Sequence, residues 1–539
     1  MTAPASAFIF LATLSVNIRR LCPTVFNDDS PETVAAAMTL GITHPPGDPV
    51  LVLLGRLACL VPAGSPAFRM NLLSAALFAL VPVLVWHSLR PWLGPRGRTC
   101  AAFGAIALIA GSPVICQQAA VAKGAAYGLN LCLLLAMTRA AGAGRPAAAW
   151  FLAGVLSAHH WMTLAAYALC PVVAWAARAP LGWRPRLREA VAAAGLFALG
   201  ASPLLAQPLL DARFPAFAAG AARSAPRLTG QLSRRPFLAT ELRPEIRPVG
   251  RQIAPVAASL HLQLGAPGWI MAGAALAWAG RPALLGVALG AAVVLPVLEA
   301  LFYLSLPPAL DHLFNVFLLP SAVALAALAA LGAGAIADRW KLAGLVAALG
   351  LVLWAGPGRA PARHVLDVRF TTWSFDLARA MLAPLPPGAG LVVASDLDTF
   401  ALWHAQTVDG LRPDVLVVNW VLLRHPWYRR RVALLTGDPA LEAAPTRPVA
   451  LGGLLTRSSR PWFTCATVLE GTPPGTRLRP FHLTYAIGPG PAVGLHGLAW
   501  RGYFEAANRF PEPYARLAAG YTAECVRTLA AGAVTTPRL

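Results

Sequence analysis

Long apolar segments recur through the first 356 residues, and they restrict the fold more than any other feature of the sequence. A membrane-spanning helix needs about 20 apolar residues, and on this measure the sequence predicts about eleven spans. The expected spans are 6–22, 69–89, 100–112, 120–139, 147–160, 161–178, 189–208, 266–280, 283–304, 313–334 and 341–356. Only 12% of all residues are charged, whereas a soluble domain carries about 25%. The sequence therefore predicts a polytopic α-helical membrane protein.

The arginine distribution predicts how these spans are oriented. Basic residues gather in every second connection, and such connections stay in the cytoplasm. The first span carries no convincing cleavage site and is expected to stay as a helix with a cytoplasmic N-terminus. We expect an integral protein of the bacterial cytoplasmic (inner) membrane, in contact with membrane lipids. The formal net charge of +21 then reflects topology, and no nucleic-acid partner is expected.

The C-terminal third differs in character, because it has no spanning segment and many polar and proline residues. The expected elements there are a helix over Val365–Leu382, a strand over Gly390–Ser395, a helix over Phe400–Val408 and a strand over Asp414–Leu422. Strands that alternate with helices indicate a small α/β domain with a parallel pair. The predicted division is a membrane domain over 1–356 and an extracytoplasmic soluble α/β domain over 357–539. Cys465 and Cys525 could pair there if the compartment is oxidising.

Three carboxylates, Asp28, Asp29 and Glu32, stand together directly after the first apolar segment. The whole chain has 23 acidic residues, so this is a marked concentration. Acids at a membrane boundary are costly to desolvate, which indicates chemistry or ion handling. The alternative is a solvated loop in which Ser30 caps a helix and Glu32 lies in its first turn.

Several segments occur in an order that resembles the DUF2723 family, relatives of the protein O-mannosyltransferases. They are Asp29-Ser-Pro-Glu32, Leu40–Gly47, Phe68–Leu73, Leu156–His160, Phe317–Ser321, Ser395–Trp403, Gly410–Val415 and Leu422–Tyr428. The resemblance implies a GT-C type glycosyltransferase that uses a polyprenyl-phosphate sugar as donor. It also implies that Asp29 takes a proton from the acceptor, with Pro31 in place of the family's glycine.

The residue types at the acidic segment suit that chemistry. A carboxylate within hydrogen-bond reach can take the proton that a hydroxyl loses as it attacks the anomeric carbon. A single displacement of this kind inverts the anomeric centre. Asp28 and Glu32 are expected to orient the acceptor or to hold a divalent cation, although no further carboxylate cluster supports a metal site.

Cationic and polar groups on the expected outer side are candidates for contacts with the donor phosphate. They are His44, Arg69, Asn71, Lys123, His159 and His160. Each has an ordinary alternative: loop structure for His44, snorkelling for Arg69, and a buried core position for the paired histidines. At Lys123 the acid that family members show before a tyrosine is absent, which leaves its contact open.

Asp396 and Asp398 follow a predicted strand, where α/β sheets place ligands. They are candidates for acceptor recognition, and the alternative is a helix cap built from Asp398 or Thr399. Arg412-Pro-Asp414 is expected to fix a loop.

The sequence favours an inverting glycosyltransferase acting at the outer face of the membrane, on a protein or glycan hydroxyl. Mannose is suggested by the family's eukaryotic members. Two alternatives stay open. One is a transporter or flippase for a polyprenyl-linked or anionic substrate, and the other is a non-catalytic membrane scaffold that presents its outer domain.

Overall fold

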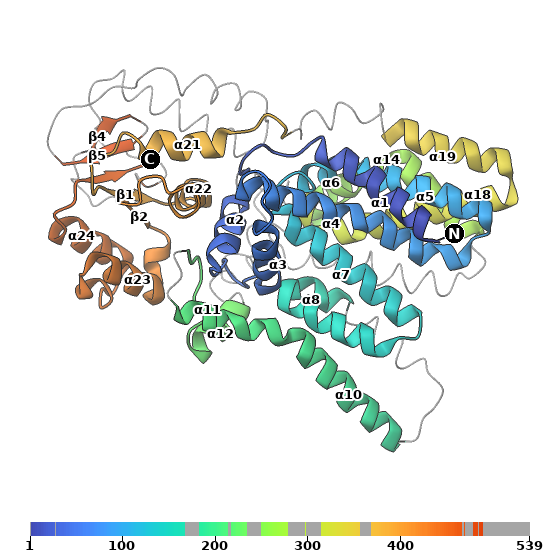
Figure 1. Cartoon of the computed structure of the whole chain (residues 1–539), viewed down its shortest axis with the longest axis horizontal. Coiled ribbons are helices and arrows are strands. Elements are labelled where there is room, and N and C mark those ends of the chain that lie inside the picture. Colours follow the sequence, from blue (N-terminus) through green and yellow to red (C-terminus); the bar gives the residue numbers. More distant parts are fainter. Residues whose placement is uncertain are drawn as a thin grey trace. The chain divides into compact units, whose positions relative to one another are not determined.

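The computed structural model describes residues 2–26, 29–167, 183–213, 217–233, 249–278, 297, 314–355, 368–465, 468, 478–482 and 484–488. The chain forms two compact units (Figure 1). The first comprises Met1–Cys22 and Leu40–Phe370, and the second comprises Pro23–Thr39 and Thr371–Leu539. This division differs from the expected one at 356/357, because the segment that carries the acids groups with the second unit.

The described elements of the first unit are all helices, joined by turns and loops. Its elements are α1 (Thr2–Ile18), α3 (Pro49–Cys59), α4 (Pro66–Leu89), η1 (Arg90–Trp92), α5 (Pro95–Ala110), α6 (Pro113–Gln118), α7 (Gly124–Gly142), α8 (Pro146–Tyr167), α10 (Trp183–Ala201), η2 (Ser202–Leu205), α11 (Ala206–Ala212), α12 (Ala225–Leu232), α14 (Val249–Trp278), α17 (Phe314–Phe317), α18 (Leu319–Arg339) and α19 (Lys341–Ala355). Within the described ranges, four stretches are long and apolar enough to cross a membrane: Pro66–Trp92, Gly124–Gly142, Leu187–Ala212 and Leu319–Arg339. Shorter apolar helices include α1, α3 and α19. These helices bear out the expectation of an integral membrane protein, and the count of about eleven spans stays a prediction.

Small residues let the helices of this unit pack closely. Helix α18 lies against α5 and α14, and α8 lies against α10 (Figure 1). A Cβ added at Gly332 would come 2.0 Å from the Met271 carbonyl oxygen of α14. One added at Gly154 of α8 would come 2.1 Å from the Phe197 carbonyl oxygen of α10. Close backbone approach at small residues is the usual way in which membrane helices associate.

The prediction of two spans that meet at His159-His160 is wrong. Helix α8 runs without interruption from Pro146 to Tyr167. The segment Leu156-Ser-Ala-His-His160 contains neither proline nor glycine, so polar side chains there do not end the helix. The rest of the expected span 161–178 and nearly all of 283–304 lie outside the described residues.

The long connection after α10 begins with short helices. It contains α11 and α12, and α14 then starts at Val249, ahead of the expected span 266–280. Gly265 interrupts α14 with a positive φ of 63°, so two helical halves meet at a kink there.

The second unit is an α/β domain with one helix from the N-terminal part of the chain. Its elements are α2 (Ser30–Thr39), α21 (Trp373–Leu382), β1 (Gly390–Val393), α22 (Asp396–Thr407), β2 (Leu416–Asn419), η6 (Leu422–Arg424), α23 (Pro426–Thr436), η7 (Pro439–Leu441), α24 (Arg447–Arg457), β3 (Trp462–Thr464), β4 (Leu478–Phe481) and β5 (Thr484–Ile487). The five strands form one sheet in the order β2-β1-β3-β5-β4. Strand β1 is parallel to β2 and β3, which confirms the predicted parallel pair, whereas β5 is antiparallel to its neighbours.

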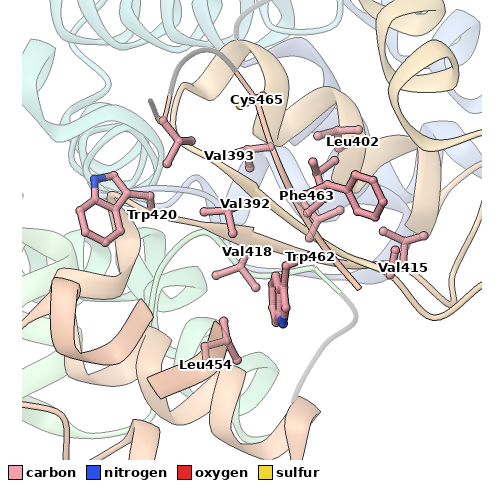
Figure 2. Packing of buried hydrophobic residues seen from close by; sticks show 14 of the residues in the cluster. Val392, Val393, Leu402, Val415, Val418, Trp420, Leu454, Trp462, Phe463 and Cys465 are labelled. Carbon is pink, nitrogen blue, oxygen red and sulfur yellow. The ribbon is translucent and has the colours of Figure 1, made fainter. Parts of the chain in front are cut away.

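Strand β1 is buried on both faces, as its apolar run Gly390-Leu-Val-Val393 predicts. On one face Val392 and Val418, paired in register, lie toward Leu454 of α24 (Figure 2). On the other face Phe463 lies toward Leu402 of α22 (Figure 2). The alternation of side chains along each strand therefore builds two layers of core.

Two expected elements of this domain are longer in the sequence analysis than in the structure. The helix expected over Val365–Leu382 starts at Trp373, and residues 361–367 lie outside the described ranges. The strand expected over Asp414–Leu422 ends at Asn419, because the Asn419 Oδ1 accepts a hydrogen bond from the Leu422 amide and turns the chain.

Helix α2 packs on α22, which explains why the segment 23–39 belongs to this unit. Its residues from Ser30 to Ala37 are all buried, and Ala35–Ala37 have no exposed surface. On α22, Phe400 and His404 are 4% and 3% exposed, although neither belongs to the core of the sheet. The spacing of four residues places them on one face of α22, so this helix buries a second face beside the one on the sheet.

Candidate active site

The acidic segment leads into α2, and its acids differ in exposure. The Asp29 carbonyl oxygen accepts hydrogen bonds from the Thr33 amide at 2.9 Å and the Thr33 hydroxyl at 2.7 Å. Asp29 therefore occupies the N-cap position, where the positive end of the helix dipole stabilises a carboxylate. Asp29 is half-buried, whereas Glu32 is 1% exposed. A carboxylate oxygen of each lies within 4.8 Å of the other, and Asp28 lies outside the described residues.

In the first unit, His44 lies in a tight and mostly buried turn. The His44 carbonyl oxygen accepts from the Gly47 amide at 2.8 Å, and Gly47 has a φ of 73° that favours glycine. The Thr43 hydroxyl accepts from the Asp48 amide at 3.0 Å. Thr43 and Pro45, on either side of His44, are buried, while His44 itself is half-buried. The backbone of the turn is therefore held inside the unit.

Arg69 and Asn71 are engaged by backbone carbonyl groups. The three guanidinium nitrogens of Arg69 donate to the carbonyl oxygens of Cys59, Ala63 and Gly64, at 2.5, 3.1 and 3.0 Å. Asn71 has no exposed surface, and its Nδ2 donates to the Cys22 carbonyl at 2.8 Å. Cations near the C-terminal end of a helix satisfy its last carbonyl groups, here at the end of α3. These contacts indicate a structural role for both residues.

Lys123 stands at the N-cap position of α7 and is half-buried. Its ammonium group lies 6.0 Å from the ring centroid of Tyr127, within the range of a cation–π contact. Nothing in this contact consumes the charge, so Lys123 stays a candidate for a phosphate contact.

His159 is 1% exposed and joins three helices. Its Nε2 lies 2.8 Å from the Ala126 carbonyl oxygen of α7, and its Nδ1 lies 3.8 Å from Asp48 Oδ1. A carbonyl oxygen only accepts, so Nε2 carries a proton. The ring therefore links α8 to α7 and to the start of α3. His160 lies in α8, and its side chain lies outside what the structure describes.

Sequence reasoning missed Asp48 as a partner of His159. It directly follows the Pro-Pro-Gly turn, and its position as the only acid between Glu32 and the second span was the available signal. The aspartate and the histidine are more than a hundred residues apart, so their pairing follows from tertiary structure alone.

At the carboxyl edge of the sheet, Asp398 belongs to an internal polar network. It is 3% exposed, and the Cys465 thiol donates to its Oδ2 at 3.3 Å. The neighbouring Thr399 hydroxyl accepts from the Asn419 Nδ2 at 2.8 Å. Ser395, rather than Asp398 or Thr399, caps α22 through the Asp398 amide at 3.3 Å. Asp398 is therefore engaged within the protein, whereas Asp396 is exposed at the same helix start.

Of the two cysteines that could pair, Cys465 is buried beside Asp398, and Cys525 lies outside the described residues.

The described residues form a mostly helical unit and an α/β unit, and this fold has a counterpart among solved structures. The fold resembles that of ArnT from Cupriavidus metallidurans bound to undecaprenyl phosphate, with a TM-score of 0.52 and 13% sequence identity. The likeness covers 90% of this chain and 100% of that chain. At this identity the likeness concerns the fold alone.

Parts of the sequence also match known protein families. Residues 29–113 match the N-terminal domain of protein O-mannosyl-transferase TMEM260, and residues 374–436 match TMEM260-associated domain 2. The mouse (Mus musculus) protein O-mannosyl-transferase TMEM260 is 36% identical over 84 residues, which is 15% of this chain and 12% of that protein. These matches show that parts of the chain are similar to O-mannosyltransferase-like proteins, as its motifs predict. The chain matches only about an eighth of the length of the mouse relative, so the activity of the whole relative is not transferred to it.

Proposed function

We propose that this protein is an inverting glycosyltransferase that moves a sugar from a polyprenyl-phosphate donor to a hydroxyl acceptor. The observation that carries the proposal is Asp29. It is a half-buried carboxylate at the start of a buried helix, and it opens the segment 29–113 that matches the O-mannosyl-transferase domain. Mannose is the proposed sugar, and a protein or glycan hydroxyl at the outer face of the membrane is the proposed acceptor.

In this scheme Asp29 accepts the proton of the acceptor hydroxyl while the oxygen attacks the anomeric carbon. The bond from that carbon to the phosphate oxygen breaks, and the polyprenyl phosphate leaves with the electron pair. A positioned general base typically contributes 10²- to 10⁴-fold to the rate. The developing phosphate charge needs donors, for which His44 and Lys123 are the partly accessible candidates.

Glu32 supports this arrangement from the buried side of the same helix turn. Its carboxylate lies within 4.8 Å of that of Asp29, which is close enough for Glu32 to help orient the acceptor hydroxyl. The scheme assigns no step to a divalent cation. Carboxylate oxygens are suitable ligands for one, and transfer measured with and without a chelator tests that possibility.

The test is sugar transfer from undecaprenyl-phosphate mannose by the purified full-length protein in proteoliposomes. Asp29→Asn should lower kcat by about 10²- to 10⁴-fold while the protein still binds undecaprenyl phosphate. Asp376→Asn is the matched control, because Asp376 also lies in the first turn of a helix of the second unit. Transfer that is unchanged in Asp29→Asn would show that another group is the base.

The same preparation separates the two alternatives. Movement of the labelled lipid across the bilayer without transfer would favour a flippase. A protein that neither transfers nor moves the lipid would favour a scaffold. A reporter fused to the C-terminus tests the proposed extracytoplasmic position of the second unit.

A further inference from the structure

Two buried glutamines form hydrogen bonds with the turn that contains His44. Gln207 in α11 is 2% exposed, and its Nε2 donates to the Pro46 carbonyl oxygen at 3.3 Å. Gln231 in α12 is 3% exposed, and its Nε2 donates to the Thr43 carbonyl oxygen at 2.8 Å. The two amides thus donate hydrogen bonds to backbone carbonyl groups on either side of His44.

Main-chain hydrogen bonds tie the same two parts of the chain together. Ile42 forms a parallel bridge with Ala218, in which the Ala219 amide donates to the Ile42 carbonyl at 2.8 Å. Beyond the bridge, Asp211 Oδ2 accepts from the amides of Ala222 and Arg223, both at 2.7 Å. The connection between α10 and α14 is therefore itself fixed where it meets the His44 turn.

Glycines make this approach possible. A Cβ added at Gly47 would lie 2.8 Å from Gln207 Nε2, and one added at Gly220 would lie 2.4 Å from Gln231 Oε1. Real Cβ atoms do not come this close to a neighbour, so each glutamine amide is packed directly against a backbone that has no side chain.

We propose that Gln207 and Gln231 are positioning residues that hold the His44 imidazole in place for the donor phosphate. This inference rests on the proposed function. The turn is closed locally by hydrogen bonds from the Gly47 amide to the His44 carbonyl and from the Asp48 amide to the Thr43 hydroxyl, and both join residues of the turn itself. The two glutamine bonds tie the turn to α11 and α12, so they limit its orientation before the donor binds. Preorganised donors act on a developing charge without reorganisation at the moment of reaction.

The chain offers a matched control for variants that remove these donors. Gln263 in α14 is also 2% exposed, and its Nε2 donates to a backbone carbonyl, that of Asn315, at 3.2 Å. Gln231→Met and Gln207→Met remove an amide donor at the turn with little change in volume. Gln263→Met removes the same kind of bond elsewhere in the first unit.

The first measurement is hydrogen exchange of the peptide covering 40–50, in full-length protein in nanodiscs without donor. Loss of one net hydrogen bond should speed exchange of this peptide about five- to tenfold in Gln231→Met. Gln207→Met should have a smaller effect, because its bond is longer, and Gln263→Met should have none there. Unchanged exchange in both turn variants would overturn the proposal.

The second measurement separates positioning from mere stability. Gln231→Met should raise KM for undecaprenyl-phosphate mannose about five- to tenfold, with KM for the acceptor and the melting temperature close to those of Gln263→Met. Gln231→Glu should regain activity relative to wild type as the pH falls, because a protonated carboxyl can again donate to the Thr43 carbonyl. Equal donor KM values in Gln231→Met and Gln263→Met would refute a positioning role.

Failure of the proposed function would look different. If the wild-type protein transfers no sugar, binding of undecaprenyl phosphate replaces the kinetic measurement. Weaker binding by Gln231→Met than by Gln263→Met, together with faster exchange at 40–50, would still support the positioning role. Equal binding would overturn it.

Discussion

Arg412 joins α21 to the entry of β2, and its removal tests how the second unit is held together. Its Nε and Nη2 donate to the two carboxylate oxygens of Asp414, at 2.9 and 2.8 Å. The remaining donor contacts are to the carbonyl oxygens of Leu382, Ala383, Leu385 and Pro386, at 3.1, 3.3, 2.6 and 3.0 Å. The residue adopts a left-handed φ of 46°, which is unfavourable for any residue but glycine. The prediction that Arg412-Pro-Asp414 fixes a loop agrees with these contacts.

The expected loss of stability in Arg412→Ala follows from the hydrogen bonds and the ion pair that the substitution removes. A hydrogen bond to a charged group contributes about 1.5–3 kcal/mol, and bonds that share one guanidinium are not additive. The exposed ion pair itself adds at most about 1 kcal/mol. Arg412→Ala should therefore destabilise the segment by about 3 kcal/mol. Arg412→Gly loses the same bonds but relieves the left-handed strain, so it should be about 1 kcal/mol less harmful.

Native-state hydrogen exchange of the full-length protein measures this locally, in peptides that cover the end of α21 and β2. Arg412→Ala should speed exchange there about a hundredfold, and Arg412→Gly should speed it about five times less. Arg430→Ala is the control, because Arg430 makes only an exposed contact with Glu442 at 4.0 Å. An effect of Arg412→Ala no larger than that of the control would refute the reasoning. Equal effects of alanine and glycine would refute the strain contribution.

Acid should weaken the same segment in the wild type. Hydrogen bonds from Arg412 and from the Gly388 amide hold the pKa of Asp414 well below its usual range. A depressed carboxyl pKa contributes stability above the ordinary value near 4, and this stability is lost as the pH falls through the folded-state pKa. Arg412→Ala should therefore show less additional loss of protection below about pH 4 than the wild type.

Two further predictions concern other parts of the second unit. Burial, followed by the charges of Arg424 and Arg429, lowers the pKa of His425 to about 4. The folded state then disfavours protonation, so α23 should lose protection as the pH falls from about 6.5 toward 4, and His425→Phe should remove this loss in hydrogen exchange. Phe400→Ala should leave a cavity on the face of α22 away from the sheet core, at a cost of about 3 kcal/mol. Exchange of the α2 amides should rise and sugar transfer should fall, and unchanged exchange in α2 would contradict this packing.

The local sequence pattern was sufficient to predict β1 and its parallel pairing with β2. Four consecutive apolar residues followed by Ser395 and Asp396 predict a buried strand that leads into a helix, and the structure has both. Hydropathy was misleading at His159-His160, since it reports polarity and not helix breaking. Inside a continuous helix, His159 hydrogen-bonds to the Ala126 carbonyl and lies 3.8 Å from Asp48.

The candidate site could be predicted only where the chemistry is local. The helix start at Ser30 follows from residue types next to each other in the chain, as does the position of Asp29 before it. The hydrogen bonds of Arg69 with three carbonyl groups do not follow from neighbouring residue types, because they depend on how the turn after α3 folds back. The burial of Asp398 against Cys465 depends in the same way on strands brought together by the sheet.

The helix that follows the proposed base packs on a helix of the C-terminal α/β domain. Ala35–Ala37 have no exposed surface, and the partner of α2 within the second unit is α22, some 360 residues further along the chain. A polypeptide ending at residue 356 would retain Asp29 but would lose the helix on which α2 packs. Helices as short as α2 are marginal in isolation, so the start of the helix would no longer be fixed. In the proposed scheme the α/β domain is therefore part of the support of the base, and we expect residues 1–356 alone not to transfer sugar.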